Sequence, residues 1–433
     1  MSKWNASIDG IHNVASFRNL LLISLVALST PFLSVPAIAA PDPATVILTS
    51  FGNAGKGADD TAIFQKSLNK TAIKGQTLEI PAGTYNVRPL YIPANSSVVL
   101  DAGAVIQATA GYGENDHLLN ISDVQNVSIS GTPGQSIFRM RKAEYTSGEF
   151  RHCLAIEGAT NVTIGGIQCN DSGGDGAYIG EGRQGYSANI KILNSGFDNN
   201  RRQGLSLISG RDIVITNCTF SNTSGTAPSA GIDIEPNQTS DFLQDIVIDH
   251  SSSTGNEGSG LVFGIERLNA SSPPVSIKVS NFKSERNTES GFSATNGQDG
   301  ATYGVPGTIL VTDSTSISDG KYGAIASYWE AGGASLTFQN LTVVNANGWK
   351  NNVDNAAITV KRGGGATHPM GNVHFSGTSI IDTTGNLDVY FTVHDWSHIG
   401  ITQLQFLDHR KLMGAKRGVG LLNGLPALAV NIK

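Results

Sequence analysis

Cysteine and charge are both scarce in this sequence, and each shortage narrows the class of protein. Three of the 433 residues are cysteine, namely Cys153, Cys169 and Cys218. Because the cysteines are few and odd in number, disulfides are not expected to be the main source of stability. We expect buried free thiols, with Cys169 at a core position. Charged residues make up 15% of the chain and the formal net charge is −6. A nucleic-acid binder normally has a basic excess, so we expect no nucleic-acid partner.

Runs with the apolar spacing of a helix are missing outside the N-terminal region. Glycine is abundant, at 51 residues, and hydrophobic residues make up 39% of the chain, the balance of a globular protein. Short apolar alternations separated by turn residues fill most of the sequence, and this pattern is typical of β-strands. The composition therefore predicts an all-β fold, either a solenoid or a sandwich.

One long apolar run lies near the N-terminus. It follows Arg18, contains Pro31 and Pro36, and ends in "AIA" at Ala39, the small-x-small pattern of a signal-peptidase site. We predict that residues 1–39 are a cleaved signal peptide, so that the mature chain is secreted or periplasmic and has no membrane association. An N-terminal membrane anchor is the alternative, which the two prolines and the cleavage site disfavour.

The same pair of short alternations recurs along the chain. One segment opens on a small residue or cysteine, as in "CLAIEG", "GLSLISG" and "GIDIEPN", and a second follows it, as in "NVTIGGIQC", "DIVITNCTF" and "DIVIDHSSS". The repeats begin roughly 23 to 35 residues apart, which suits one coil of a solenoid. Stacked coils let Ile232 and Ile234 line a continuous interior while Asp233 and Glu235 point outward. We therefore predict a right-handed parallel β-helix.

The region before the coils predicts a short helix that covers the open end of the solenoid. Asp59 and Asp60 can cap a helix that carries Ile63, Phe64 and Leu68 on one side. We predict one β-helix domain over residues 40–433, with a cap at about 45–75, regular coils at about 76–382 and a closing segment at 383–433.

The cap region and the first coils resemble the pectate-lyase-like superfamily. The segments that carry the resemblance are "SFGNAGKGADDTAIFQKSL", "IPAGTY" and "YIPANSSVVLDAGAVIQA". The resemblance covers most of the mature chain and implies the same right-handed parallel β-helix. It indicates function only moderately, because many chemistries use this scaffold.

Four polar residues stand just before the opening segment of successive coils, namely His117, His152, Asp175 and Gln203. Neighbouring coils lie roughly 4.7 to 4.9 Å apart, so these side chains are expected to form a ladder. Asp175, in "DSGGDGAYIG", is the strongest single candidate for a catalytic residue. We include His117 and Gln203 among the substrate-binding candidates.

Two adjacent arginines, Arg201 and Arg202, are expected beside the ladder. In an acidic chain they suit a carboxylate or sulfate on the substrate, because guanidinium groups bind such anions through paired hydrogen bonds. The alternative is that they are solvated turn residues paired with Asp198 or Glu235. We therefore expect a polysaccharide substrate that is anionic.

Two enzyme families resemble the chain around this ladder. Polygalacturonases resemble it at "GGDG" alone, because "RRQG" replaces their aspartate pair and Ala230 replaces their histidine. Bacterial mannuronan C5-epimerases resemble it in order and spacing: "EFRHC", "GGDG" and "NNRRQG" follow like D-P-H-E, L-D-G and N-D-R-H-G, although the first motif lacks its aspartate and proline. The resemblance carries over His152 and Asp175, with Arg202 and Gln203 in place of Arg-His.

Proton abstraction at C5 of a uronate requires a neutralised carboxylate together with a base and an acid near the ring. Arg201, Arg202 and a proton shared with Asp175 would neutralise the substrate carboxylate, and His152 or Tyr145 would be the base or acid. Return of the proton to the opposite face gives epimerisation, and loss of the C4 substituent gives a lyase.

Two other functions stay open. A glycoside hydrolase would use Asp175 with Asp233 and Glu235, although coil and strand spacing place Asp175 far from Asp233. The non-catalytic alternative for Asp233 and Glu235 is that they line the groove or form a salt bridge with Arg202. The third function is a non-catalytic glycan-binding protein.

The remaining candidates belong to substrate binding. Tyr322 and Trp329 can offer a sugar-stacking surface, although Trp329 can equally pack under a loop, and Asp171 and Tyr145 are included as groove residues. No metal site or cofactor is predicted, since no calcium-type aspartate cluster, calcium repeat or phosphate loop is visible; calcium is not indicated.

Overall fold

The structure is a computed structural model, and it describes residues 44–57, 59–297, 304–352, 354–361 and 370–394, together with four short strands after residue 403. Residues 43–433 form one compact unit. The predicted signal peptide lies outside the described residues, as do parts of the predicted closing segment. No helix in the described part is long and apolar enough to cross a membrane.

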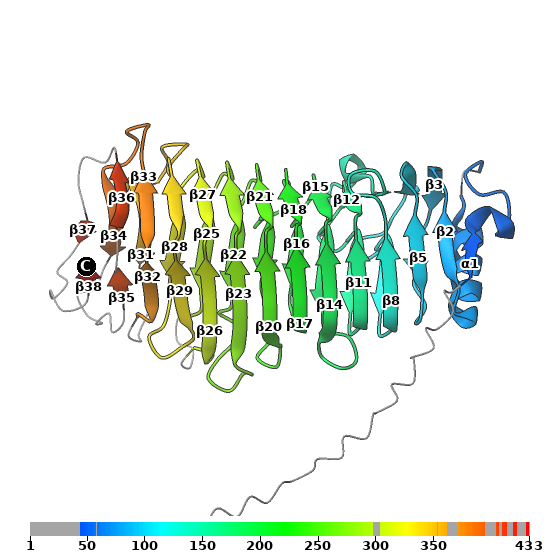
Figure 1. Ribbon diagram of the computed structural model, residues 1–433, viewed down its shortest axis with the longest axis horizontal. Helices are drawn as coiled ribbons and strands as arrows, with labels where there is room; N and C mark the ends of the chain where they lie inside the picture. The colour runs from blue at the N-terminus through cyan, green and yellow to red at the C-terminus, as the bar shows by residue number, and fades with distance from the viewer. Residues whose placement is uncertain are drawn as a thin grey trace, which may run out of the picture. The chain divides into compact units, whose positions relative to one another are not determined.

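Three parallel sheets, of 14, 12 and 12 strands, make up the fold (Figure 1). Sheet A contains β1 (Thr45–Ile47), β2 (Thr77–Ile80), β5 (Ser97–Leu100), β8 (Gln125–Ser130), β11 (Thr160–Gly165), β14 (Ser187–Leu193), β17 (Gly210–Thr216), β20 (Leu243–Asp249), β23 (Val275–Ser280), β26 (Gly307–Thr312), β29 (Ser335–Gln339), β32 (Val373–Ser376), β35 (Leu404–Phe406) and β38 (Val430–Ile432). Sheet B contains β3 (Gly83–Val87), β6 (Ala104–Ala108), β9 (Ile137–Arg139), β12 (Gln168–Asn170), β15 (Gly196–Asp198), β18 (Thr219–Ser221), β21 (Ser252–Thr254), β24 (Lys283–Glu285), β27 (Thr315–Ile317), β30 (Thr342–Val344), β33 (Thr378–Ile381) and β36 (His409–Met413). Sheet C contains β4 (Leu90–Tyr91), β7 (Leu119–Ser122), β10 (Leu154–Glu157), β13 (Ala177–Gly180), β16 (Leu205–Leu207), β19 (Ile232–Ile234), β22 (Leu261–Gly264), β25 (Phe292–Thr295), β28 (Ala324–Ser327), β31 (Ala356–Lys361), β34 (Val389–His394) and β37 (Val419–Leu421).

Each regular coil gives one strand to each sheet in turn. The chain runs through β10 in sheet C, β11 in sheet A and β12 in sheet B, and then returns to sheet C as β13, which pairs in parallel with β10. The repeat seen in the sequence is this coil. The predicted right-handed parallel β-helix is therefore the fold of the chain.

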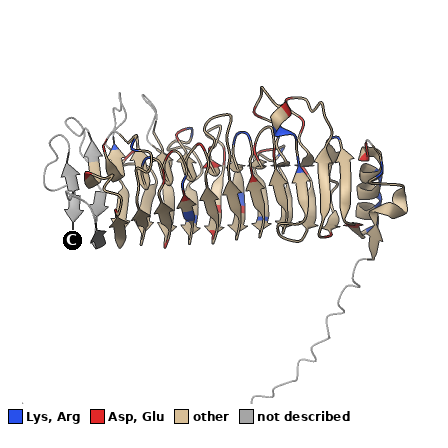
Figure 2. Cartoon of the chain, turned by 90° about the horizontal axis from the view of Figure 1, so that it is seen from above, with Lys and Arg blue, Asp and Glu red and all other residues tan. Residues whose placement is uncertain are grey.

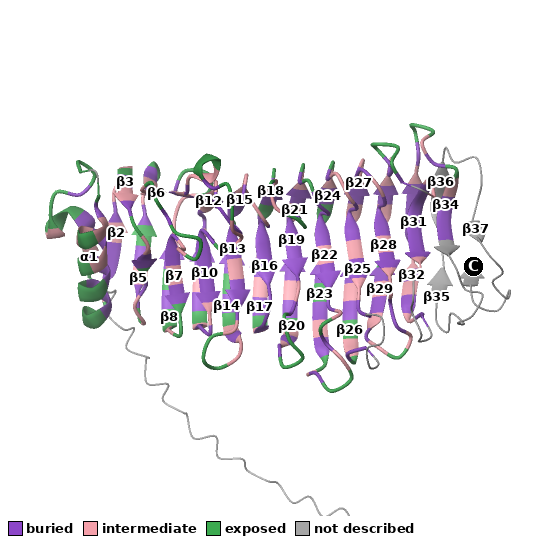
Figure 3. Cartoon of the chain, turned by 180° about the vertical axis from the view of Figure 1, so that it is seen from behind, coloured by how far each residue is buried: buried purple, intermediate pink, exposed green. Residues whose placement is uncertain are grey.

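Inward-pointing side chains stack in register to form one core. Ile164, Ile192, Ile215 and Ile248 are successive partners in sheet A, and all are fully buried. Figure 3 shows buried residues along the strands of most coils. Burial of each such side chain contributes roughly 1.5 to 3 kcal/mol, which a single coil could not gain alone. Figure 2 shows few charged residues on the strands themselves.

Asparagine residues with positive φ form a ladder at one corner of the coils. Asn126, Asn161 and Asn189 have φ angles of 59°, 57° and 50°. Asparagine tolerates this left-handed conformation better than most residues. The amide of Asn161 donates to Asn126 Oδ1 across 3.1 Å, and that of Asn189 donates to Asn161 Oδ1 across 2.8 Å. The same turn is thereby repeated from coil to coil.

A helix precedes the coils as predicted. Helix α1 (Thr61–Lys74) follows the 3₁₀ helix η1 (Leu48–Phe51), and its Phe64 and Leu68 are buried in the core. The two aspartates before α1 act differently from each other. Asp59 Oδ1 accepts the Thr61 N–H at 2.9 Å, whereas Asp60 accepts the N–H groups of Gly55 and Asn86 and so ties the preceding loop to β3.

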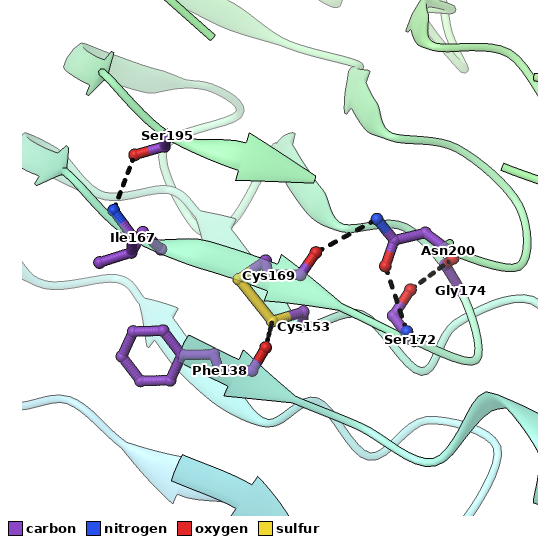
Figure 4. The surroundings of a disulfide bond; sticks show 8 residues. All are labelled: Phe138, Cys153, Ile167, Cys169, Ser172, Gly174, Ser195 and Asn200. Carbon is purple, nitrogen blue, oxygen red and sulfur yellow. Dashed lines mark hydrogen bonds between the residues drawn. A yellow bond between two sulfur atoms is a disulfide. The ribbon is translucent and has the colours of Figure 1, made fainter. Parts of the chain in front are cut away.

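The expectation of free thiols is wrong for two of the three cysteines. Cys153 and Cys169 form a disulfide with a Cα–Cα distance of 6.0 Å, and Cys218 is a buried free thiol (Figure 4). Cys169 does occupy the predicted interior position, in register with Phe197. Because Cys153 stands just before β10 in the same coil, the two sulfur atoms meet across the interior, a proximity that their separation in sequence does not reveal.

Candidate functional site

The ladder forms where the turn from sheet B enters sheet C. The N–H of Cys153 donates to the carbonyl of Asp175 and that of Gly176 to the carbonyl of Gln203, both across 3.0 Å. These bonds place His152, Asp175 and Gln203 in three consecutive coils. His117 lies one coil before His152, and the two imidazole rings stack at 4.9 Å.

His152 is buried and neutral. Its ring is sandwiched between His117 and Tyr178, whose ring centroid lies at 4.8 Å, and only 2% of the residue is exposed. Burial, followed by the charges of His117 and Arg202, holds the pKa of His152 well below its usual value. Its Nδ1 atom accepts the backbone N–H of Asp175 at 3.0 Å, so the ring proton resides on Nε2.

Asp175 is fully buried, and neither of its carboxyl oxygens has a well-formed hydrogen bond in the described part of the chain. Oδ2 lies 3.3 Å from His152 Nδ1, and Oδ1 lies 3.8 Å from Arg202 Nη1. Burial raises the pKa of Asp175 to about 7, against the opposing effect of Arg202. The carboxyl group can therefore hold a proton near neutral pH.

Arg202 lies at the centre of a group of carboxylates. Its Nε contacts Glu149 at 3.2 Å and its Nη2 contacts Glu235 at 3.1 Å, in addition to the longer contact with Asp175. Burial lowers the pKa of Arg202, but Asp175, Asp233 and Glu235 outweigh it and raise this pKa above its usual value. The guanidinium charge is thus more than offset within the site.

Gln203 bridges to the next coil. Its Nε2 donates to Asp233 Oδ2 at 2.7 Å, and its Oε1 accepts the N–H of Ala230 at 2.7 Å. Asp233 is 1% exposed, and burial followed by the charge of Glu235 raises its pKa well above its usual value. Asp175 and Glu235 both contact the guanidinium of Arg202, so these two carboxyl groups belong to one cluster.

A segment of the insertion before β10, residues 140–151, covers the ladder; we call it the strap. Arg201 holds it by donating to the carbonyls of Tyr145, Thr146 and Gly148 at 3.1 to 3.3 Å. Its guanidinium is therefore committed to the strap. The strap also passes close to Gly174, where an added Cβ would collide with the backbone of Glu149 and Arg151.

Tyr145 belongs to the strap and is nearly buried. The guanidinium of Arg151 lies over its ring at 5.0 Å, and its hydroxyl has no hydrogen-bond partner in the described residues. Burial raises the pKa of Tyr145 to about 12, which keeps its hydroxyl protonated at neutral pH and so unavailable as a base.

The site exposes only some of its groups. The side chain of Glu149 is 47% exposed, that of Glu235 38% and that of Arg202 15%, whereas those of His152 and Asp175 are nearly or fully buried. Tyr178 and His117 are half-buried. A ligand that docks without rearrangement therefore meets Arg202 and the two glutamates first.

Three predicted binding residues lie outside this cluster. Trp329 is fully buried and donates from Nε1 to the carbonyl of Ala334, and Tyr322 is 4% exposed and donates to Asp354. The expected sugar-stacking surface is therefore not formed by these two rings, because they pack inside the molecule. Asp171 lies at the end of β12, where it accepts a hydrogen bond from Asn199 at 2.7 Å.

Sequence reasoning missed Glu149 and Tyr178. Tyr178 occupies the outward column of sheet C, in register with Ser206 and, one coil further, with Asp233. That register could have indicated Tyr178. Nothing in the repeat indicates Glu149, because it lies in an irregular insertion. No group of three or more His, Cys, Asp or Glu side chains within the described ranges is arranged to hold a metal ion.

No protein-family model matches the chain. The uncharacterized protein YclG of Bacillus subtilis is 25% identical over 207 residues, a match that covers 41% of this chain. The chain spans about a third of that relative, since the match covers 35% of its length.

Solved structures give a wider match. The mannuronan C-5 epimerase AlgE4 A-module of Azotobacter vinelandii superposes with a TM-score of 0.67 at 17% identity, over 89% of this chain and 99% of that module. The family 28 exopolygalacturonase of Yersinia enterocolitica gives 0.61 at 14% identity, over 91% and 79% of the two chains. The endo-xylogalacturonan hydrolase of Aspergillus tubingensis gives 0.60 at 15% identity, over 83% and 98%. The chain shares the parallel β-helix fold of these three proteins.

Proposed function

We propose that the chain is a polysaccharide-active enzyme that abstracts the C5 proton of a uronate unit and yields an epimerised or an unsaturated product. The observation that carries this proposal is the Asp175 carboxyl, buried without a well-formed hydrogen bond between neutral His152 and Arg202. A buried polar group without a partner is costly, and such groups concentrate at functional sites.

Neutralisation of the substrate carboxylate is the main demand of this chemistry, because charge builds up there when the proton leaves. Arg202 can supply two donors once a glutamate withdraws from it. Asp175, with a pKa of about 7, can supply a third as the protonated acid. Both groups act within a largely buried site, where such interactions are stronger than in water.

His152 acts as the acid in this proposal. Because Nδ1 accepts the Asp175 N–H, the ring has a proton to donate at Nε2 and no free lone pair. The base is then Glu235, whose carboxylate reaches solvent beside Arg202. Tyr145, the other candidate from the sequence, has its pKa raised to about 12 and is the weaker choice.

The comparisons support the general class of this enzyme. The AlgE4 module is by name a mannuronan C-5 epimerase, and the motif order around His152, Asp175 and Arg202 resembles that family. The Cys153–Cys169 disulfide, together with the signal-like N-terminal segment, supports export to an oxidising compartment.

Hydrolysis is the second candidate, and one observation favours it. Asp233 is buried with a raised pKa, whereas Glu235, two residues on, is partly exposed and paired with Arg202. Two carboxyl groups in such different environments can divide the roles of acid and base in a glycosidase.

The test is incubation of the purified protein with a panel of polyuronates and neutral glycans. Ultraviolet absorbance of an unsaturated product, new reducing ends and the ¹H NMR spectrum of the polymer are followed together, with Asp175→Asn as the matched inactive control. An unsaturated product or an altered C5 configuration supports the proposal. New reducing ends alone favour hydrolysis, and binding without any product favours the non-catalytic glycan-binding function.

A further inference from the structure

A hollow of about 600 Å³ lies on the sheet B side of the strap and shares no residue with the Arg202 cluster. The end of β9, the first half of the strap and the turns after β12, β15 and β18 surround it. Its volume lies within the usual range for small-ligand sites. The lining residues that matter below are Arg139, Arg141, Lys142, Glu144, Asp171 and Asn199.

The hollow has a positive balance of charge in a chain whose net charge is −6. Three basic side chains line it against two acidic ones. Arg141 pairs with Glu144. The ammonium group of Lys142 donates to Asn199 Oδ1, to the carbonyl of Asn200 and to Ser224 Oγ, at 2.9 to 3.1 Å. Lys142 thus fixes one wall of the hollow and has no donor left for a ligand.

Arg139 differs from the other two cations. Its Nε lies 4.0 Å from Asp171 Oδ2, too far for a hydrogen bond, and its side chain is 42% exposed. Within the described residues the structure records no hydrogen bond from its guanidinium. Five donors on a planar group therefore remain for a ligand in the hollow, and a guanidinium can hold a carboxylate or sulfate through two parallel bonds.

Acceptors for hydroxyl groups lie beside these donors. Asp171 Oδ1 accepts a hydrogen bond from the amide of Asn199, which fixes the carboxylate in place. Its Oδ2 remains available to accept from a ligand. A fixed carboxylate next to a guanidinium with free donors suits a ligand that carries both hydroxyl groups and an acidic group.

We propose that this hollow is an accessory saccharide site that takes one acidic sugar unit of the polymer, with its acidic group on Arg139. This inference rests on the proposed function in one respect, namely that the polymer substrate is acidic. The strap separates the two sites: Lys142 anchors it at the hollow and Glu149 contacts Arg202. A bound polymer unit in the hollow would hold the chain close to the catalytic cluster.

The test compares Arg139→Ala with Arg183→Ala. Arg183 is a matched control because its side chain is 84% exposed, it pairs with Asp123, and its loss changes the net charge equally. Binding of oligouronates, of a sulfated oligosaccharide and of a neutral one is measured by calorimetry at low salt. We expect Arg139→Ala to weaken binding of an acidic oligosaccharide about tenfold or more, which corresponds to 1.4 kcal/mol, and Arg183→Ala to leave it unchanged. Comparison of the uronate and sulfate arms identifies the acidic group.

Asp171→Asn supplies a second variant. It keeps the acceptor for Asn199 but replaces the available Oδ2 by an amide NH2 group, which cannot accept from a hydroxyl group, so the same oligosaccharide should bind more weakly. Equal binding by wild type and Arg139→Ala would overturn the inference, and so would equal weakening by both arginine variants. Absence of any product in the polymer panel would instead refute the proposed function and leave these binding results standing.

Discussion

The backbone N–H of Asp175 donates to Nδ1 of His152 across 3.0 Å, although 23 residues separate the two in sequence. The bond is possible because consecutive coils place them side by side. It fixes the imidazole tautomer, since an acceptor nitrogen carries no proton. With its proton on Nε2, His152 can only donate a hydrogen bond in the proposed reaction, which narrows the choice of acid or base that the sequence left open.

This tautomer is directly measurable. We expect the ¹⁵N spectrum of selectively labelled protein to show a histidine that stays neutral, with its proton on Nε2, as the pH falls through the ordinary pKa of a histidine, because burial holds the pKa of His152 well below its usual value. His152→Ala should remove that signal and abolish activity. A His152 signal that titrates near its ordinary pKa would contradict this assignment.

Asp175→Asn is expected to abolish activity and to stabilise the fold at alkaline pH. The folded-state pKa of Asp175 is about 7, above its usual 3.8, so ionisation of this buried group destabilises the wild type as pH rises through that interval. The variant lacks this penalty. Its advantage in free energy of unfolding should be absent below pH 4 and reach on the order of 4 kcal/mol above pH 7.

Chemical denaturation at several pH values checks the expected stabilisation of Asp175→Asn, and an assay of product formation checks its expected loss of activity. Asp212→Asn is a suitable control, because Asp212 is exposed, lies outside both sites and undergoes the same chemical change. An active Asp175→Asn enzyme would refute the catalytic role. Equal pH dependence of stability in variant and wild type would refute the raised pKa.

Glu149→Gln is expected to lower KM for an acidic substrate several-fold while kcat changes little. Glu149 holds Arg202 Nε at 3.2 Å, and a substrate carboxylate has to compete with it for the guanidinium. Charge-assisted pairs of this kind are stronger than those with a neutral amide. The matched control is Glu289→Gln, which removes the same charge from a glutamate that pairs with Lys321 outside both sites.

Steady-state kinetics on one acidic polymer gives KM and kcat for the wild type and both glutamate variants, and so tests this prediction. A fall in KM for Glu149→Gln alone would show that the strap limits access to Arg202. An unchanged KM, or the same change in both glutamate variants, would show that Arg202 does not receive the substrate carboxylate.

The repeat made most of the fold predictable. Because each coil re-uses the same positions, the registers of His117, His152, Asp175 and Gln203 follow from their places before each opening segment. The same argument placed Cys169 in the interior beside Phe197. Regular coils convert sequence spacing into spatial neighbours, so a ladder can be inferred without coordinates.

Irregular segments carried no such information. Glu149 reaches Arg202 because the strap turns back over the ladder, and the path of an insertion is not set by the repeat. Arg201 and Arg202 are adjacent in sequence, but one holds the strap backbone and the other meets carboxylates. Trp329 is buried by its local loop, which amphipathic character alone cannot distinguish from an exposed stacking ring.

Loss of the Cys153–Cys169 disulfide should destabilise the protein measurably. The bond closes a loop with a sequence separation of 16 residues, for which chain entropy gives about 3 kcal/mol. The double variant Cys153→Ala, Cys169→Ala should therefore unfold several degrees lower than the wild type. Reductant should lower the melting temperature of the wild type and leave that of the double variant unchanged, whereas equal effects on both would show that the bond does not form.

Asp233→Asn separates the two reactions considered for the site. Burial and the charge of Glu235 raise the pKa of Asp233 well above its usual value, and asparagine imitates the protonated form while its carbonyl still accepts from Gln203 Nε2. The fold should therefore be retained. If C5 proton abstraction by Glu235 and His152 is the reaction, Asp233→Asn should change kcat/KM by only a few-fold, whereas Glu235→Gln should lower it about 100-fold or more. If the enzyme is a hydrolase, Asp233 supplies the proton to the leaving group, and both variants should lose activity to the same extent, because asparagine has no proton to give.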